Sequence, residues 1–220
     1  MGPSRDGSRL LILGFACLVV SSLCDSVRAP ALPLLAERYA AGYGRLSAFL
    51  TAGSLGSLAF NLLALRALAG LSDRAVVVLS ALLQAGAMLA AAAAPGLRTL
   101  AAAGFVWGAG NVGLGLCANL LVIRGTQEAL RARALSLLHV AYGLSCVLPP
   151  IYAASVDRSG GGAWALFGPP ALLPVLLAAA ALGLPAGHAP APPSRVAMAG
   201  APWRLGMVVA LYVLGEVMTS

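Results

Sequence analysis

Residues 99–123 read TLAAAGFVWGAGNVGLGLCANLLVI, a stretch without any charged side chain between Arg98 and Arg124. An α-helix needs about 20 apolar residues to cross the hydrocarbon core of a bilayer, which is about 30 Å thick. At that depth a helix satisfies its own backbone polar groups, which an irregular chain cannot do. The stretch therefore predicts a membrane-spanning helix.

Comparable apolar runs flank this stretch on both sides. They cover residues 10–35, 46–65, 75–94, 134–155, 163–184 and 205–220. Of the 220 residues, 60% are hydrophobic and 10% are charged, whereas a soluble globular chain carries about 25% charged residues. The first run follows Arg5 and Arg9 as a signal peptide would, but it continues past Asp25, so we interpret it as a retained helix. The sequence predicts an all-α, polytopic membrane protein.

A change of composition divides these runs into two groups. Residues 185–204 are rich in Pro, Ala and Gly, which is typical of a flexible linker. We therefore expect a six-helix transmembrane bundle over residues 1–184, a cytoplasmic linker, and a seventh helix at residues 205–220 that starts a second bundle. Because this last run is still apolar where the sequence stops, we interpret the chain either as a fragment of a longer protein or as a truncated gene product that cannot function alone.

The distribution of arginine predicts the orientation of the chain. All 14 basic residues are Arg; nine lie at the amino terminus and in the second, fourth and sixth connections, and five on the other side. Basic residues concentrate in cytoplasmic loops, so we expect a multi-pass protein of the cell (plasma or inner) membrane with a cytoplasmic amino terminus. The net charge is +7, but the Arg residues stand singly between apolar runs. This pattern argues for the lipid bilayer and against nucleic acid as a partner.

Two charged residues interrupt the first run and are its candidate functional groups. Asp25 lies about 22 Å along the predicted helix, in the outer half of the bilayer. Arg28 follows three residues later on the same face, close enough to pair with it. Charges within a span usually face a cavity or a partner, so we expect both to line a polar path. The alternative is a helix that ends near Cys24 and leaves both side chains in water.

Four further polar residues lie inside the apolar runs. Asn111 and Asn119 share a stripe with small residues on the 99–123 helix, where they either pack or line a cavity. His139 lies within two turns of the start of its helix, as a packed residue or as part of a gate or proton path. Glu216 lies near the expected midplane of the seventh helix, where a carboxyl group could carry a proton. The alternative is that this end of the chain forms no proper helix.

The sequence argues against metal-dependent, cofactor-dependent and catalytic functions. The four cysteines lie inside apolar runs and have no metal-ligand spacing to one another or to either His. The chain contains no His-Glu-His, Ser-His or paired Asp arrangement at catalytic spacing. We therefore expect no cofactor, no metal and no enzymatic activity.

Several segments resemble the major facilitator superfamily of transporters. AGLSDR (69–74) is similar to the superfamily's loop signature between the second and third helices, with Asp73 and Arg74 at matching positions and Val76–Val78 where the signature has Gly-Arg-Arg. LHVAYG (138–143) and LYVLGE (211–216) resemble the fucose–proton symporter branch. DSVRAP (25–30) is similar to an Asp-x-x-Arg-x-Pro pattern in the first helix of related permeases.

The resemblance implies the amino-terminal half of such a transporter plus the first helix of its second half. It implies alternating access, proton coupling through membrane carboxyl groups, and a sugar or another small polar solute as substrate. A seven-helix receptor or sensor without transport activity is the alternative, although its amino terminus would be expected outside. An intramembrane enzyme ranks third.

Overall fold

The computed structural model describes residues 5–67 and 71–183, and all of its regular structure is helical. The chain divides into a unit of residues 1–189, which contains every described helix, and a unit of residues 190–220. The predicted linker (185–204) and the predicted seventh helix (205–220), including Glu216, lie outside the described residues. The helices are α1 (Arg5–Asp25), α2 (Leu32–Tyr39), α3 (Tyr43–Ala67), α4 (Asp73–Ala93), α5 (Leu97–Gly125), the 3₁₀ helix η1 (Glu128–Leu130), α6 (Arg131–Ser145), α7 (Leu148–Arg158) and α8 (Ala163–Leu182).

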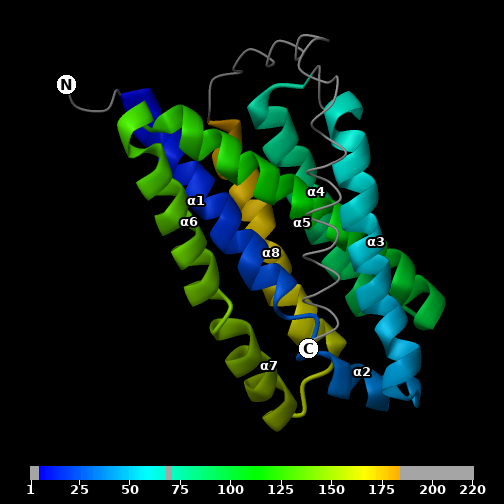
Figure 1. Ribbon diagram of the computed structural model, residues 1–220. Coiled ribbons are helices and arrows are strands. Elements are labelled where there is room, and N and C mark those ends of the chain that lie inside the picture. The colour runs from blue at the N-terminus through cyan, green and yellow to red at the C-terminus, as the bar shows by residue number, and fades with distance from the viewer. Residues whose placement is uncertain (1–4, 68–70, 184–220) are drawn as a thin grey trace. The chain divides into compact units, whose positions relative to one another are not determined.

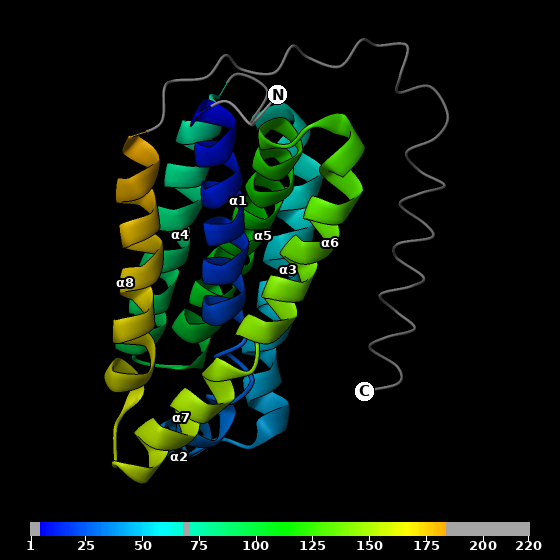
Figure 2. The ribbon, with the colours of Figure 1, turned by 90° about the vertical axis from the view of Figure 1, so that its left-hand side faces the viewer.

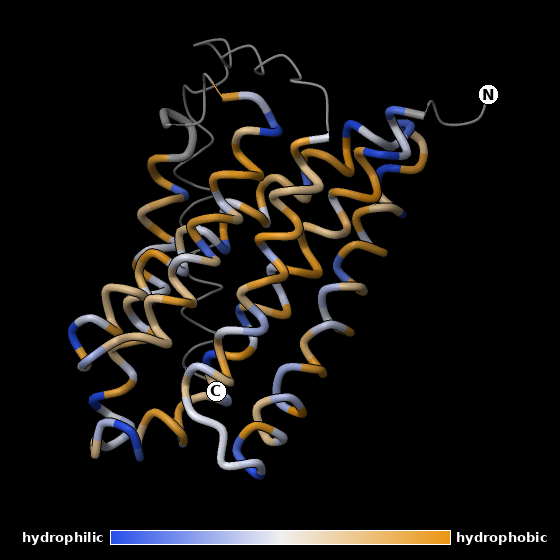
Figure 3. The backbone as a smooth tube through the Cα atoms, turned by 180° about the vertical axis from the view of Figure 1, so that it is seen from behind, coloured by the Kyte–Doolittle hydropathy of each residue, from blue (hydrophilic) through white to orange (hydrophobic). Residues whose placement is uncertain are grey.

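Six helical segments are long and apolar enough to cross a membrane, as the sequence predicts. They are Asp6–Asp25, Tyr43–Leu63, Asp73–Ala93, Leu97–Gly125, Glu128–Arg158 and Ala163–Leu182. Hydrophobic residues follow the length of these helices, and hydrophilic residues gather mostly at their ends (Figure 3). Large apolar side chains such as Leu62, Leu144 and Leu176 are about two-thirds exposed. This apolar exterior suits a lipid environment and would be unfavourable in water.

Helix α5 occupies the centre of the bundle and packs against α1, α3 and α4 (Figures 1 and 2). Helix α4 also contacts α8, and α1 contacts α6 and α8. The first turn of α1 shares one end of the bundle with the start of α4 and the ends of α5 and α8; we call this the amino-terminal end. Helices α2 and α7 are both at the opposite end (Figure 2).

The structure corrects two predicted helices, because both are interrupted near prolines. The run 10–35 is not one helix: α1 ends at Asp25, and turns lead to α2 at Leu32. The run 134–155 is likewise divided into α6 and α7 at Cys146 and Val147. Proline has no backbone N–H and restricts the residue before it. Pro30 lies in the first interruption, and α7 opens with proline at its first positions. By contrast, α8 continues through its three prolines.

Glycines allow α3 and α5 to approach closely. A side chain at Gly56 would overlap the backbone carbonyl group of Phe105, and one at Gly108 would overlap the carbonyl group of Gly53. The Ser57 hydroxyl donates a hydrogen bond to the Gly108 carbonyl oxygen at 3.1 Å across the same contact. Small residues at such positions let membrane helices pack backbone to backbone.

Two side chains of α2 attach it to the end of α4. The Arg38 guanidinium donates hydrogen bonds to the carbonyl oxygens of Ala92 at 2.7 Å and Ala94 at 3.0 Å. The Tyr39 hydroxyl donates to the same Ala94 oxygen at 2.7 Å. These donors satisfy carbonyl groups that the end of a helix leaves without partners. Burial raises the pKa of the Tyr39 phenol, and this effect outweighs the opposite influence of Arg38.

The buried apolar residues form two clusters along the bundle. The cluster towards the opposite end includes Phe49, Trp107 and Phe167. The cluster towards the amino-terminal end includes Leu114 and Leu121. Helix α1 contributes to both clusters, and its buried Ser21 and Ser22 lie between those contributions.

Candidate functional site

A row of polar side chains follows the last turns of α1 into the interior of the bundle. It consists of Ser21, Ser22 and Asp25, and it continues past the helix end with Ser26 and Arg28. Ser21 and Ser22 are 2% and 0% exposed, so this face of α1 is removed from solvent. Buried hydroxyl and charged groups require partners in an apolar environment. The partners of these side chains must therefore come from one another and from the neighbouring helices.

Asp25 and Arg28 form an ion pair, as the sequence predicts. The alternative was right that the helix ends near Cys24, since α1 ends at Asp25. It was wrong that both groups are free in water, since the side chains of Asp25 and Arg28 are 21% and 15% exposed. The pair forms across the end of α1 rather than along a continuous helix, because the chain turns after Asp25. The Arg28 backbone N–H donates to the Asp25 carbonyl oxygen at 3.2 Å, and its Nε approaches the same oxygen at 3.5 Å.

Helices α3 and α5 form the surroundings of the Arg28 guanidinium. Its Cζ atom lies 6.0 Å from the centre of the Trp107 ring, within the range of a cation–π interaction. On α3, a side chain at Gly53 would overlap Arg28 Nη1. A glycine at this position therefore leaves the space that the guanidinium occupies. The charge of Arg28 is stabilised by Asp25 and by the ring face of Trp107.

Trp107 is a site residue that the sequence analysis missed. Its ring is fully buried between Phe49 and Phe167, in edge-to-face contacts with centroid distances of 5.9 and 5.5 Å. Its indole N–H has no hydrogen-bond acceptor among the described residues. A lone Trp in an apolar run is usually a packing residue, and only its contact with Arg28 indicates another role.

A second polar group continues the site along α5, with Asn111 at its centre. The Asn111 Oδ1 atom accepts a hydrogen bond from Ser21 Oγ at 2.5 Å and a longer one from Gln84 Nε2 at 3.5 Å. Three helices, α1, α4 and α5, thus meet through one amide oxygen. Asn111 therefore takes part in packing between helices, and its predicted role in lining a cavity stays a prediction.

Gln84 is the second residue that the sequence analysis missed. It is 0% exposed, and its Oε1 atom accepts no hydrogen bond within the described part of the chain. Arg28 Nη1 and Asp25 Oδ1 also lack hydrogen-bond partners there, apart from the ion pair itself. Unsatisfied buried groups are rare in native structures and indicate water, an ion or a ligand. The signal in the sequence was a single amide in the middle of the run 75–94.

Helix α6 closes the row on the remaining side of α1. The Ser22 hydroxyl donates to the Tyr142 carbonyl oxygen at 2.9 Å. Both Ser22 and Ser26 contact the Cys146 sulfur, at 3.1 and 3.3 Å. Cys146 is the residue that follows α6, so these contacts link the interruptions in the first and fifth spans.

Two predicted site residues make no described contact with this row. Asn119 is half-buried, and its amide donates to the Gly115 carbonyl oxygen of its own helix at 2.9 Å. His139 has an exposed side chain on α6, whereas Tyr142 and Cys146 reach α1 from the same span. The functional roles predicted for Asn119 and His139 stay predictions.

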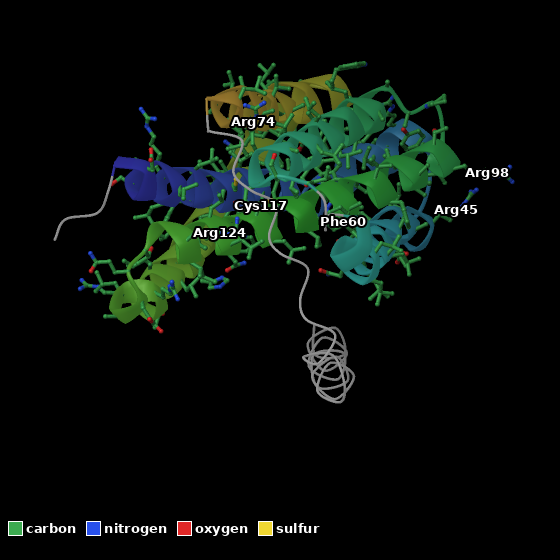
Figure 4. All side chains as sticks on the ribbon, turned by 90° about the horizontal axis from the view of Figure 1, so that it is seen from above. Arg45, Phe60, Arg74, Arg98, Cys117 and Arg124 are labelled. Atoms are coloured by element: carbon green, nitrogen blue, oxygen red, sulfur yellow. The ribbon has the colours of Figure 1, made fainter. Side chains whose placement is uncertain are left out.

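The predicted loop motif binds helix ends together at the amino-terminal end. Asp73, in the first turn of α4, forms an ion pair with Arg124 in the last turn of α5. Arg74 Nη1 approaches the carbonyl oxygen of Leu182 at the end of α8, at 3.5 Å (Figure 4). The Ser72 hydroxyl caps α4 by accepting from the Ala75 N–H at 3.2 Å. The sequence placed Asp73 and Arg74 in a functional loop, but it did not indicate Arg124 as a partner.

No protein-family model matches this sequence, and no curated protein matches it either. Within residues 5–67 and 71–183, no three His, Cys, Asp or Glu side chains are grouped as metal ligands. The interpretation of the site therefore depends on its geometry and chemistry. That geometry is a mostly buried ion pair at a helix break, together with hydrogen-bonding atoms that have no partner in the described part of the chain.

Proposed function

We propose that this chain forms part of a secondary transporter that moves a small polar, sugar-like solute across a cell membrane by alternating access, with protons as the coupling ion. The observation that carries the proposal is the Asp25–Arg28 ion pair, mostly buried where a membrane-spanning helix ends. Charges inside a bilayer are costly and typically mark ion and substrate paths. The resemblance of residues 69–74 and 138–143 to the major facilitator superfamily supports the same proposal.

Proton coupling follows from the chemistry of the ion pair. A proton that binds Asp25 removes the negative charge that stabilises Arg28. An unpaired guanidinium in a low-dielectric interior is strongly unfavourable, so it favours any conformation that offers water or a new partner. Loading and release of the proton therefore change the relative stability of two arrangements of α1 against its neighbours. The interruptions after Asp25 and at Cys146 are the points where the first and fifth spans can bend.

A polyhydroxylated solute fits the free hydrogen-bonding atoms near the pair. Within residues 5–67 and 71–183, Trp107 Nε1 and Arg28 Nη1 are donors without acceptors, and Gln84 Oε1 is an acceptor without a donor. A sugar hydroxyl both donates and accepts, so one class of ligand can satisfy all three atoms. While Asp25 and Arg28 are paired, their charges cancel, which favours a neutral solute over an ion.

The test is solute accumulation by the full-length protein that contains this chain, reconstituted into liposomes under an imposed pH gradient. Radiolabelled monosaccharides serve as probes, and the variants are Asp25→Asn and, as a matched control, Asp157→Asn. Asp157 is an exposed carboxyl group at the end of α7. We expect the Asp25 variant to lose gradient-driven accumulation while it retains solute exchange without a gradient, since exchange needs no net proton movement. The control is expected to accumulate solute like the unaltered protein.

Two results would reject the proposal. Accumulation by the Asp25 variant at the unaltered level would remove the pair from coupling. Binding of a solute without any movement across the membrane would favour the receptor or sensor alternative.

A further inference from the structure

A long apolar groove follows the contact between α1 and α8, on the outside of the bundle and separate from the polar row. It has a volume of about 510 Å³. Its wall on α1 includes Ile12 and Ala16, and its wall on α8 includes Leu176 and Ala180. Ile12 and Leu176 are 69% and 66% exposed, so the groove is open on its outer side. Helices α1 and α8 contact each other along this seam.

The length of the groove matches one leaflet of a bilayer. Its residues on α1 extend from Arg9 to Val20, a rise of about 16 Å along a helix. Half of a hydrocarbon core about 30 Å thick is about 15 Å. A second apolar hollow of about 240 Å³ continues the same seam beyond Leu173, towards Val27. The groove therefore has about the length of a single acyl chain.

Positive charge lies at the amino-terminal end of the groove. Arg9 lines the groove there, is exposed, and forms no ion pair with any described residue. Asp6, one turn earlier, is also exposed and is not paired with it. The first turn of α1 adds the positive end of a helix dipole. At the end of α8, Arg74 approaches the Leu182 carbonyl oxygen and offsets the negative end of that helix.

We propose that this groove binds an anionic phospholipid, with one acyl chain along α1 and α8 and the phosphate at Arg9. The apolar walls exclude a polar ligand, and the open side faces the lipid phase. The position of Arg9 at the end of an acyl-length groove selects a lipid with a negatively charged headgroup. Basic sites beside transmembrane helices recognise anionic headgroups in this way. The inference does not depend on the proposed transport function.

The test compares lipid binding to the delipidated protein in detergent by native mass spectrometry. The probes are phosphatidylglycerol and phosphatidylcholine with identical acyl chains. Since one basic residue near the membrane surface contributes about fivefold in affinity, we expect phosphatidylglycerol to bind about fivefold more tightly. Arg9→Gln is expected to abolish this preference. Arg98→Gln, an exposed arginine at the opposite end of the bundle, should retain it (Figure 4).

A second pair of variants tests the acyl-chain part of the site. Ala180→Trp fills the groove and is expected to weaken the binding of both lipids. Ala179→Trp adds the same ring at the neighbouring exposed residue, which does not line the groove, and should leave binding unchanged. Because Arg9, Ala179 and Ala180 are all exposed, these changes leave the buried core intact.

Several outcomes would overturn the inference. Equal affinity for the two lipids, or a preference that survives Arg9→Gln, would exclude a headgroup site at Arg9. A protein dimer that dissociates with Ala180→Trp would show that a second copy occupies the groove. A disulfide cross-link from a cysteine introduced at Ala180 to one at residues 205–220 would assign the groove to that segment of the chain.

Discussion

Replacing Gly108 with alanine is expected to destabilise the bundle, whereas the same change at Gly115 on the same helix is expected to stabilise it. A Cβ atom at Gly108 would overlap the Gly53 carbonyl oxygen and lie 2.7 Å from the Gly53 carbonyl carbon. A Cβ atom at Gly115 would meet nothing within 4 Å. The two variants add the same methyl group to α5, so the difference between them isolates the contact with α3.

The magnitude follows from the geometry of that contact. Carbon atoms pack at about 3.5–4.0 Å, so α3 must move by about 1 Å to accept the methyl group at Gly108. Overpacking of this kind costs about 1–3 kcal/mol. The movement also weakens the Ser57 hydrogen bond to the Gly108 carbonyl oxygen, which is worth about 0.6 kcal/mol in a membrane. The higher helix propensity of Ala offsets about 1 kcal/mol of this loss of stability.

We therefore expect Gly108→Ala to lower the free energy of unfolding by about 2 kcal/mol and Gly115→Ala to raise it by about 1 kcal/mol. For a chain of this size, these changes correspond to a Tm lower by about 4–8 °C and higher by about 2–4 °C. The measurement is thermal unfolding of both variants in the same detergent, followed by circular dichroism. Equal Tm values for the two variants would refute the close contact of α3 and α5.

Three further predictions concern charged and titratable groups. Asp25→Asn and Arg28→Gln should each lower the free energy of unfolding by about 3 kcal/mol, because each change leaves one buried polar group unpaired. The double variant should lose clearly less than the sum of the two single losses. Strictly additive losses in denaturation experiments would contradict the pairing. Tyr39 should ionise above the ordinary tyrosine pKa of about 10, because burial raises its pKa. The contribution of Tyr39 to stability should be complete below pH 10 and decrease as the pH rises through the folded-state pKa. Absorbance at 295 nm, compared between the unaltered protein and Tyr39→Phe, measures the ionisation of this phenol. Ionisation of Tyr39 at or below pH 10 would contradict the prediction. Asp73→Asn or Arg124→Gln should cost at most about 1 kcal/mol, because this pair is partly exposed; a much larger loss of Tm would show that the pair is shielded from water.

The helix break after Asp25 illustrates where sequence reasoning succeeded and failed. The sequence identified Asp25 and Arg28 as a buried pair because two charges within an apolar run are expensive to leave alone. It joined residues 10–35 into one helix, although Pro30 and Pro33 lie in that run. The apolar run was the stronger pattern, but the missing N–H of proline decided the local structure. Arg28 therefore lies in the turn that follows α1, where it still pairs with Asp25 three residues earlier.

Gln84 and Trp107 show why the rest of the site could not be predicted. Each is a single residue in an apolar run, and no spacing distinguishes it from a packing residue. Their roles depend on which face of α4 or α5 turns towards α1. Lipid and neighbouring helices are both apolar, so hydrophobicity does not encode that rotation. The ion pair between Asp73 and Arg124 depends likewise on the packing of two helix ends.

The sequence by itself determined that six segments of the described chain can cross a membrane, because the length of an apolar run can be compared directly with the thickness of a bilayer. It also identified Asp25 and Arg28 as the charges that interrupt the first apolar run. The tertiary structure alone decided which atoms surround the charges: the Trp107 ring, the space left by Gly53 and the amides of Asn111 and Gln84. Those neighbours follow from the rotation and depth of each helix, which are set by packing between side chains far apart in the chain.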